Sequence, residues 1–484
     1  MKRPLYITLY DYSTCFDSLW LEDTMLSLWE IGLQNQFLPL LYNMNKDCHI
    51  TIRTPYGFSE EFSCPSIVKQ GAVLSTSLCG SSTGRISKKL QSTNHCGTSI
   101  GSSNIHAVLF VDDTATTNST TLGSIESHKT VVSFANAINL SINAPKCAQL
   151  IINNPKNDAP PLLLVDNKII PTVDTSKYLG DIFAANGTNN PLIIDRVNKG
   201  KTIIITALSI CNDVTLGNHY IRSALILYQC VFLASVLFNC QSWSNLTQTQ
   251  IKNLRTVQLK FLKRIMQAPN ATPNCFVFLE LAVLPIEYEI HRRQLAFLHH
   301  ILNLPESNPV HQQYLQQLSF SFEPNWANNI KQLLCTYDLD HIDIKSLTKH
   351  TWRCLVKSKI TKLAFDNLTT QSANQSKTHI LRYDSFLLQK YILSAPDVAS
   401  FIFRVRGRML NCRDNQHRHH PNITCRHCYV EIENQDHIVN CRSIFPNEQV
   451  LSTSDFFSSN FDPDITTIKQ IMRRYDDYLT HANS

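Results

Sequence analysis

Two adjacent aspartates, Asp112 and Asp113, end an apolar run at residues 106–111. An apolar run that breaks at paired acids predicts a strand with two carboxylates at its tip. A second predicted strand, at residues 5–11, ends at Asp11 in the same way. Carboxylates that converge from neighbouring strands supply the hard oxygen ligands that Mg²⁺ prefers. We therefore expect a sheet with an acidic edge, whereas an acid pair taken alone is more often a solvated turn.

The first 185 residues alternate short strands with helices, a pattern typical of an α+β domain. Alternating residues on both sides of Tyr56-Gly57 predict a β-hairpin at residues 49–64. The Ser- and Gly-rich stretch at residues 79–104 predicts a loop or a poorly formed helix. The other elements predicted here are helices at 19–33 and 127–138 and strands at 147–153 and 162–170.

From about residue 186 the pattern changes to long helices without a clear strand. Residues 191–300 hold 11 Lys and Arg against 5 Asp and Glu, which accounts for the whole formal charge of +6. Within them, residues 251–266 predict an amphipathic helix whose cations lie off the apolar stripe. A basic face suits a phosphate backbone, although a solvated face is the plain alternative. These cations are Lys252, Arg255, Lys260, Lys263 and Arg264.

Neither secretion nor a membrane span is expected. The N-terminal apolar run stops at Asp11, too early for a signal peptide, and the 16 cysteines are mostly scattered singly, as in reduced intracellular proteins. The uncharged stretch at residues 223–240 is interpreted as a buried helix, because it contains Gln229 and Asn239.

Four residues near the C-terminus have the spacing of a metal site: Cys425-x2-Cys428-x8-His437-x3-Cys441. Thiolates and an imidazole fill a tetrahedral, structural Zn²⁺ site, while ordinary buried thiols are the alternative. Five arginines precede or adjoin this cluster, so the unit is expected to contact nucleic acid rather than to act as a catalytic zinc centre. They are Arg404, Arg406, Arg408, Arg413 and Arg418.

Five segments in fixed order carry a resemblance to a known family. Over most of residues 5–185 the chain resembles the palm of non-LTR (LINE-type) retrotransposon reverse transcriptases. The Cys-Cys-His-Cys element is similar to one near the end of the same proteins. The five segments are Asp11–Asp17, Lys69–Ser75, Phe110–Asp113, Leu140–Lys146 and Lys177–Gly180.

The resemblance implies an RNA-directed DNA polymerase that uses two Mg²⁺ ions, an RNA template, a DNA primer and deoxynucleoside triphosphates. Asp11, Asp112 and Asp113 would be the metal ligands, and Lys146 would protonate the leaving pyrophosphate. Strand-end capping for Asp11 and core packing for Phe16 are the plain alternatives. The implied nucleotide and template contacts are Phe16, as the gate against a ribose 2′-hydroxyl, Gln70, Gly71 and Phe110; the implied primer grip is Tyr178, Leu179 and Gly180.

The predicted organisation is a right-hand polymerase palm, followed by all-α regions and a small zinc-knuckle-like unit. Only ten residues precede Asp11, so we expect an N-terminally truncated member without most of the fingers. The alternative is an inactive element fragment that binds RNA or DNA through the basic helix and the zinc unit. No protein partner is indicated, and such a polymerase would act on nuclear DNA. The predicted ranges are 1–185 palm, 186–300 thumb-like, 301–400 connection, 401–445 zinc unit and 446–484 tail.

Overall fold

The computed structural model describes residues 4–46, 49–63, 72–154, 159–211, 219–320, 324–416, 422–458 and 464–481. The chain divides into two units. The first consists of Met1–Leu192 with Leu304–Ser321, and the second of Ile193–Asn303 with Phe322–Ser484. The change from a mixed α/β pattern to a helical one near residue 186 therefore falls close to the boundary between the units.

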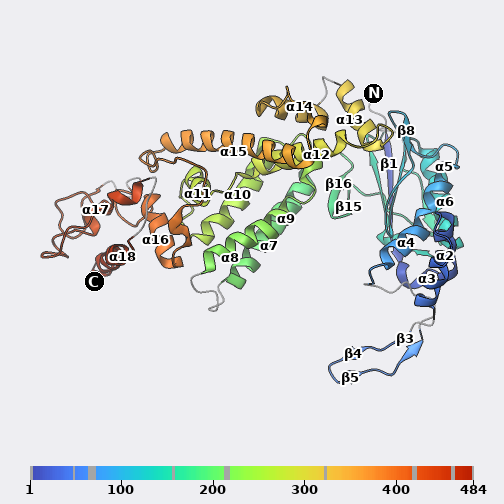
Figure 1. Cartoon of the computed structure of the whole chain (residues 1–484), viewed down its shortest axis with the longest axis horizontal. Coiled ribbons are helices and arrows are strands. Elements are labelled where there is room, and N and C mark those ends of the chain that lie inside the picture. The colour runs from blue at the N-terminus through green and yellow to red at the C-terminus, as the bar shows by residue number, and fades with distance from the viewer. Residues whose placement is uncertain are drawn as a thin grey trace. The chain divides into compact units, whose positions relative to one another are not determined.

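The first unit is built on a four-stranded antiparallel sheet (Figure 1). Its order is β12 (Ala148–Ile152), β1 (Leu5–Tyr10), β10 (Asp113–Asn118) and β9 (Ala107–Phe110). Helix α6 (Thr121–Ala137) packs on β1 and β10 with its buried apolar side chains, among them Val131 and Phe134. The predicted strands that end at Asp11 and at the acid pair thus belong to one sheet, in which β10 lies between them.

Helices α2 (Leu21–Glu30), α4 (Ser75–Gly84) and α5 (Ile86–Gln91) lie beside this sheet (Figure 1). The expectation of a loop or poorly formed helix at residues 79–104 was wrong for α4 and α5. Small polar side chains let α2 and α4 approach closely, since Ser27 Oγ lies 2.8 Å from Ser81 Oγ and Ser82 Oγ donates to Thr24 Oγ1 at 3.2 Å. The serines of α4 therefore serve as a helix contact surface rather than as loop residues.

Short hairpins and turns complete the first unit. The hairpin predicted around Tyr56-Gly57 is confirmed, because β4 pairs with β5. The strand predicted at residues 162–170 is instead a hairpin, because β13 pairs with β14 across Asp166-Asn167. The short elements are α1 (Cys15–Ser18), α3 (Phe37–Asn45), β2 (Tyr12–Ser13), β3 (His49–Ile50), β4 (Arg53–Thr54), β5 (Gly57–Phe58), β6 (Phe62–Ser63), β7 (Thr98–Ile100), β8 (Ser103–Ile105), β11 (Ser141–Ile142), η1 (Ala144–Lys146), β13 (Leu164–Val165), β14 (Lys168–Ile169), β15 (Thr175–Tyr178) and β16 (Asp181–Ala184).

Helix α13 (Pro309–Ser319) belongs to the first unit, although the sequence places residues 301–400 in one helical connection. It packs on the β7–β8 hairpin. Two glutamine side chains of α13 accept backbone hydrogen bonds there, Gln316 Oε1 from Gly101 N at 3.3 Å and Gln312 Oε1 from Ser102 N at 3.4 Å. The chain thus leaves the first unit near residue 192 and returns to it for one helix.

The second unit is helical in its described residues (Figure 1). Its core includes a cluster of stacked and tilted rings from Tyr228, Phe232 and Phe261. Its longer helices are α7 (Asn190–Cys211), which begins just before the unit boundary, α8 (Tyr220–Leu227), α10 (Gln248–Ile265), α11 (Asn274–Leu281), α12 (Ile286–Leu302), α14 (Trp326–Thr336), α15 (Lys349–Ala373), α16 (Pro396–Arg406) and α18 (Ile465–His481). Its shorter ones are the π-helical turn η3 (Tyr228–Phe232), α9 (Leu233–Val236), η4 (Cys240–Ser242), η5 (Ile344–Ser346), η6 (Lys390–Leu393), α17 (Gln435–Ile438) and η7 (Ser454–Phe457).

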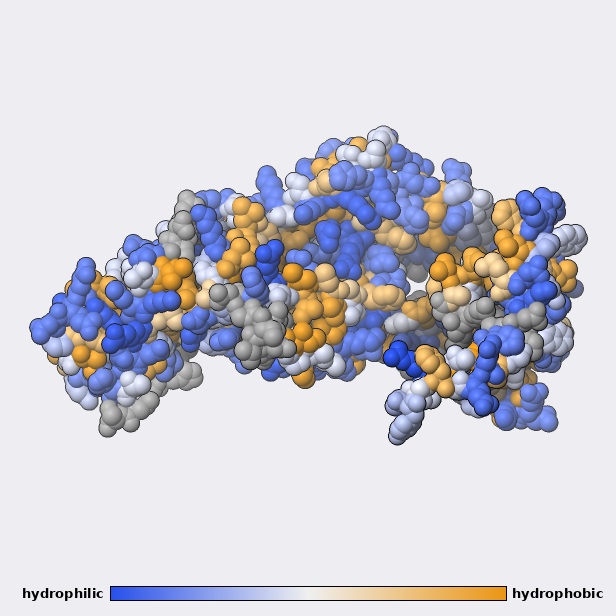
Figure 2. All heavy atoms as spheres, turned by 60° about the horizontal axis from the view of Figure 1, so that its bottom comes forward, coloured by the Kyte–Doolittle hydropathy of each residue, from blue (hydrophilic) through white to orange (hydrophobic). Residues whose placement is uncertain are grey.

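The apolar stretch at residues 223–240 spans α8, η3, α9 and the start of η4. Several of its apolar side chains are buried and others are exposed, and α7 likewise has exposed apolar side chains. In the space-filling view, hydrophobic side chains gather over α7 and α8 (Figure 2). No helix among the described residues is long and apolar enough to cross a membrane.

A buried charge network ties the second unit together. Glu280 of α11 and Arg406 of α16 are both fully buried and form an ion pair at 2.9 Å. Tyr383 and Tyr391 donate hydrogen bonds to the same carboxylate, and Arg406 also donates to the carbonyl oxygens of Phe456 and Ser458. The buried charges are therefore compensated by partners from at least four separate segments of the chain.

Candidate active site and metal centre

The three aspartates predicted as metal ligands lie at one edge of the sheet. In the antiparallel register Tyr10 pairs with Thr114, so Asp11 follows β1 where Asp113 begins β10. Asp112 occupies the turn between β9 and β10, in which Phe110 pairs with Asp113. Partial burial, together with the negative charges of Asp112 and Asp11, raises the pKa of Asp113. The structure therefore brings these carboxylates into electrostatic contact.

The turn that carries Asp112 has a strained backbone and is held in place by helix α4. Val111 adopts a φ of 58°, a left-handed conformation that a β-branched residue rarely takes. Its carbonyl oxygen accepts a hydrogen bond from Thr83 Oγ1 of α4 at 2.6 Å. Gly80 lies one turn earlier in α4, and a Cβ at this residue would be 4.0 Å from the Val111 Cα, an ordinary van der Waals contact. Helix α4 is thus a support for the acidic turn.

Lys146, the residue implied to protonate the leaving pyrophosphate, lies beside Asp11. The Lys146 Nζ is 4.0 Å from Asp11 Oδ2, and both side chains are accessible to solvent. The backbone of Asp11 holds the two segments together, because Asp11 O accepts from Asn143 N at 2.8 Å and Asp11 N donates to Cys147 Sγ at 3.4 Å. Residues 143–147 therefore position an ammonium group next to the acidic edge.

The hairpin of β15 and β16 is joined to the strands of the acidic edge. Tyr178 Oη donates to Val108 O of β9 at 3.0 Å and lies 3.5 Å from Asp113 O of β10. Burial, followed by the charge of Asp113, raises the pKa of Tyr178 to about 12. Leu179 and Gly180 both have positive φ, the conformation of a tight two-residue hairpin turn. The residues predicted as a primer grip are thus placed next to the aspartates.

The remaining residues predicted near the nucleotide have different surroundings. Phe16 of α1 is half-buried and packs against the core of the first unit, while Phe110 is 59% exposed. Gln70 and Gly71 lie outside the described residues. The plain alternative for Phe16, core packing, is therefore compatible with its surroundings.

The five cations predicted on α10 do not form one face. Lys263 is buried, its Nζ donates to Asn270 O at 2.8 Å, and burial lowers its pKa. Arg255 forms a bidentate pair with Glu287, at 3.2 and 2.6 Å. Lys252, Lys260 and Arg264 are exposed. Only these last three are therefore directed to solvent in the manner that a phosphate-binding face requires.

The predicted metal-binding group comes together in the second unit. The ligand atoms of Cys425, Cys428, His437 and Cys441 all lie within 4.8 Å of one another. Cys425 Sγ is 3.7 Å from Cys441 Sγ, and Cys428 Sγ is 3.5 Å from His437 Nε2. Tetrahedral Zn²⁺ with bonds of about 2.3 Å to sulfur and 2.0 Å to nitrogen needs edges of about 3.8 and 3.5 Å. The spacing therefore fits Zn²⁺.

Groups around the four side chains favour the orientation and the protonation state in which these side chains bind a metal. His437 Nδ1 is 2.9 Å from Glu431 Oε2, which leaves Nε2 directed toward the thiols. Burial alone would raise the pKa of Cys428, but the backbone N–H groups of Glu431 and Val430 hold it at about 7. Cys425 Sγ lies 3.0 Å from Tyr478 Oη of α18. Helix α18, within the predicted tail, is thus part of this centre.

Two of the arginines expected to carry positive charge beside the metal are bound by other groups of the chain. Arg406 is buried against Glu280, and Arg413 Nη1 donates to Thr424 O at 2.8 Å. Arg426, which the sequence pattern did not single out, pairs with the buried Glu433. Arg418 lies outside the described residues. For Arg406, the expectation of a nucleic-acid contact was wrong, because its side chain is fully buried.

Several site residues could not be identified from the sequence. Thr83, Cys147 and Tyr478 support the sites through contacts with residues 28, 136 and 53 positions away along the chain. No local pattern identifies such contacts, because they depend on how distant segments pack. For Tyr478, the helical period of residues 465–481 is the one feature of the sequence that pointed to an ordered C-terminal element.

Two solved structures show a likeness over part of their length, and no curated protein matches the chain. The first is apo telomerase from Candida tropicalis, with 10% identity, a TM-score of 0.31 and coverage of 74% of this chain and 54% of that one. The second is telomerase from Candida albicans in complex with a fragment of telomeric RNA, with 12% identity, a TM-score of 0.27 and coverage of 54% and 46%. The chain thus spans about half the length of these solved chains.

The family comparison covers the unit that carries the aspartates. Residues 1–183 match the family described as reverse transcriptase (RNA-dependent DNA polymerase). The match includes Asp11, the acid pair, Lys146 and the β15–β16 hairpin except its last residue. Residues 1–183 therefore carry a reverse transcriptase domain.

Proposed function

We propose that this chain is an RNA-directed DNA polymerase that extends a DNA primer on an RNA template. The observation that carries the proposal is the convergence of Asp11, Asp112 and Asp113 at one sheet edge within the reverse transcriptase domain. In the reaction the primer 3′-oxygen forms a bond to the α-phosphorus of the incoming nucleotide, and the bond to pyrophosphate breaks.

The donor set at this edge fits Mg²⁺. Three carboxylates offer hard oxygen ligands. Partial burial raises the pKa of Asp113, and so does repulsion from Asp112 and Asp11, which a bound cation would relieve. Two Mg²⁺ ions would supply activation of the 3′-hydroxyl and stabilisation of the leaving pyrophosphate. The aspartates would hold these ions, with the acidic turn kept in place by Thr83 of α4.

The neighbouring residues have matching roles in this proposal. Lys146, held beside Asp11, would donate a proton to the leaving pyrophosphate. The β15–β16 hairpin would hold the primer end at a fixed distance from the aspartates, because Tyr178 bonds to the strand that precedes them. Phe16 would exclude a ribose 2′-hydroxyl, and Phe110, Gln70 and Gly71 would contact the nucleotide or template.

The second unit would bind the duplex through phosphate contacts. A groove of about 420 Å³ lies between α7 and α10, and Lys201 and Lys260 are among its lining residues together with Asn198, Asn253 and Thr256. Ammonium, amide and hydroxyl groups bind phosphate oxygens without reading sequence. Lys252 and Arg264 extend the exposed basic face of α10 beyond this groove.

We also infer a structural Zn²⁺ at Cys425, Cys428, His437 and Cys441, and an origin in a non-LTR (LINE-type) retrotransposon. The edge lengths of the four-residue group support the metal. The order of the palm motifs, followed by a C-terminal Cys-Cys-His-Cys element, supports the type of element. Either inference can be wrong while the polymerase proposal holds.

Primer extension with the purified chain, an RNA template and Mg²⁺ tests the polymerase proposal. Asp112→Asn keeps the size of the side chain but removes a charged ligand, so extension should fall by at least about a hundredfold while nucleic-acid binding persists. Asp17→Asn is a matched control on an exposed acid of the first unit outside the proposed ligand set. An Asp112→Asn variant as active as the wild type would overturn the two-metal assignment. Binding without extension by the wild type would favour the inactive fragment.

A further inference from the structure

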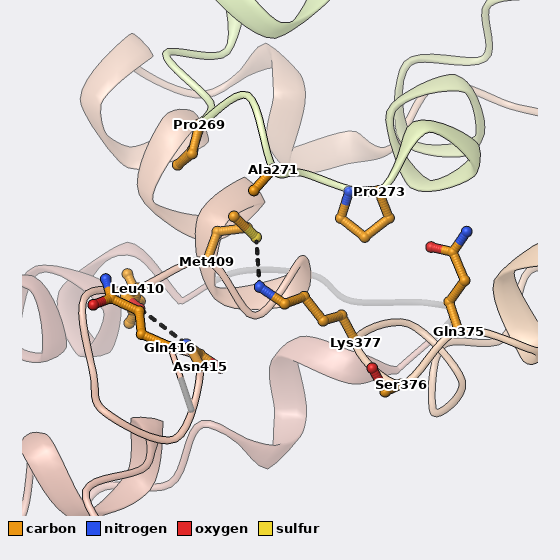
Figure 3. A pocket seen from close by; sticks show the side chains of 10 residues that line it. All are labelled: Pro269, Ala271, Pro273, Gln375, Ser376, Lys377, Met409, Leu410, Asn415 and Gln416. Atoms are coloured by element: carbon orange, nitrogen blue, oxygen red, sulfur yellow. Dashed lines mark hydrogen bonds between the residues drawn. The ribbon is translucent and has the colours of Figure 1, made fainter. Parts of the chain in front are cut away.

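Three turns of the second unit enclose a pocket of about 760 Å³ (Figure 3). The turns follow α10, α15 and α16. The described residues of its lining are Pro269, Ala271, Pro273, Gln375, Ser376, Lys377, Met409, Leu410, Asn415 and Gln416. This volume lies within the range of about 300 to 1,000 Å³ that is typical of ligand sites. None of these turns carries a residue assigned to the polymerase reaction or to the zinc centre.

The polar side chains of the pocket are suited to a group that both donates and accepts hydrogen bonds. Gln375, Asn415 and Gln416 bring three carboxamides to its lining. Two of them have a fixed orientation, because Asn415 Nδ2 donates to Leu410 O and Gln416 Nε2 donates to Asn411 Oδ1, both at 3.0 Å. Side-chain amides match the mixed donor and acceptor edges of nucleic-acid bases.

The apolar part of the lining is suited to the face of a flat ring. Pro269, Ala271 and Pro273 lie on one side of the view, and Met409 lies beside them (Figure 3). Rigid pyrrolidine rings and a polarizable thioether make favourable contacts with aromatic faces. Lys377 crosses the pocket, with its Nζ 3.4 Å from Met409 Sδ. The described lining residues include this cation and no acid, so the pocket favours an anionic or neutral ligand.

The pocket also adjoins the end of α10, whose exposed cations the proposed function assigns to nucleic acid. Arg264 lies in the last turn of α10, directly before the 269–273 turn. On the other side, residues 409–416 lead toward the segment of Cys425 and Cys428. A nucleic-acid strand bound to the basic face of α10 would thus have the pocket next to the end of that helix.

We propose that this pocket receives an unpaired base of the bound nucleic acid. The carboxamides hydrogen-bond the edge of the base, Pro273 and Met409 contact its face, and Lys377 pairs with its phosphate. The proposal rests on nucleic-acid binding by the second unit. It adds a preference for a nucleic acid that contains an unpaired nucleotide outside the double helix.

The test compares two labelled RNA–DNA duplexes that differ by one bulged nucleotide, bound to the full chain and followed by fluorescence anisotropy. We expect the bulged duplex to bind about tenfold more tightly, the size of one well-made set of base contacts. Ala271→Trp fills the pocket from an exposed position and should remove this difference. Gln371→Trp, on an exposed position of α15 outside the lining, should keep it. The double variant Gln375→Ala/Gln416→Ala, which adds no bulk, should reduce it.

The outcomes separate this proposal from the proposed function. Equal binding of both duplexes by the wild type, or a preference that survives in both the filled and the double variant, would overturn the pocket assignment alone. Failure to bind either duplex would overturn it together with the basic surface of α10. If an excess of free nucleoside triphosphate abolishes the preference while paired binding persists, the pocket takes free nucleotides and the assignment to the bound strand is wrong.

Discussion

The hydroxyl of Thr83 is a single-atom support of the proposed catalytic turn. It lies 2.6 Å from Val111 O. The left-handed backbone conformation of Val111 costs about 1 to 3 kcal/mol. Thr83→Val keeps the shape of the side chain but leaves that carbonyl without its donor. We expect the free energy of unfolding of the first unit to fall by about 1 to 3 kcal/mol. We also expect kcat for extension to fall while the KM for primer–template changes little.

Thr83→Ser is the matched control for this prediction, because it retains the hydroxyl and removes only a methyl group. Urea unfolding and steady-state extension of the three proteins provide the measurements. A Thr83→Val enzyme with unchanged kcat would show that the acidic turn holds its position without α4.

The acidic residues themselves were accessible from sequence. Asp11 directly follows a strand, Asp112 lies in a turn between two strands, and Asp113 begins a strand. These positions could be recognised from apolar runs of the right length. The burial of Lys263 could not, because its spacing on the helix is compatible with either face. Its Nζ is drawn inward by the carbonyl of Asn270, which reaches it only after α10 has ended and the chain has turned.

At the scale of elements, α10 should bind phosphates through three of its five predicted cations. The triple variant Lys252→Gln/Lys260→Gln/Arg264→Gln should lower affinity for an RNA–DNA duplex. It should also reduce the slope of log K against log salt by up to about 0.9 for each phosphate that is no longer neutralised by a cation of α10. Anisotropy titrations at several salt concentrations measure both quantities.

The control for the α10 variant has the same change in net charge. Lys331→Gln/Lys345→Gln/Lys349→Gln neutralises three exposed lysines on α14, η5 and α15. An equal drop in affinity in both triple variants would mean that total charge, rather than the face of α10, determines binding.

The strands β1, β9 and β12 and the helices α6 and α10 followed from the hydrophobic pattern, but α4 did not. Its Ser-rich sequence lacks an apolar stripe, and its helical state depends on the close contact of Ser81 and Ser82 with α2. Tertiary packing therefore overrides the local pattern there. The C-terminal module, which consists of α18 and the four-residue group at 425–441, shows a related effect. The spacing of Cys425, Cys428, His437 and Cys441 was visible in the sequence, while the docking of α18 through Tyr478 was not.

At the scale of the whole second unit, stability should depend on the Glu280–Arg406 pair. Glu280→Gln leaves Arg406 as an uncompensated buried charge, so unfolding of this unit should become easier by about 3 to 5 kcal/mol. Tyr383→Phe removes one hydrogen bond from the same carboxylate and should cost only about 1.5 to 3 kcal/mol, the range for a bond to a charged group. Urea unfolding monitored by hydrogen exchange in α11 and α16 measures the loss of stability in each of the two variants. Equal effects of both variants would show that the charge is not the decisive contribution.

Metal removal should loosen the C-terminal module as a unit. Tyr478 of α18 contacts Cys425 Sγ and donates to Glu433 Oε2 at 3.0 Å, so loss of a bound metal removes a fixed partner of this helix. A chelator, or Cys428→Ser, should lower metal content from about one Zn²⁺ per chain and raise hydrogen exchange in residues 465–481. Cys335→Ser, at an exposed cysteine outside the group, is the control. Unchanged exchange after complete metal removal would separate α18 from the metal.

The close contact between α2 and α4 also limits how this chain can change over generations. Ser27, Ser82 and Thr24 are fully buried, and a larger side chain at any of them would force apart two helices, one of which supports the turn of Asp112. Exchange among glycine, alanine and serine is tolerable there, whereas a single-nucleotide change from serine to leucine or phenylalanine is not. Related chains that keep the turn of Asp112 in place should therefore have small residues along α4 even where the rest of their surface has diverged.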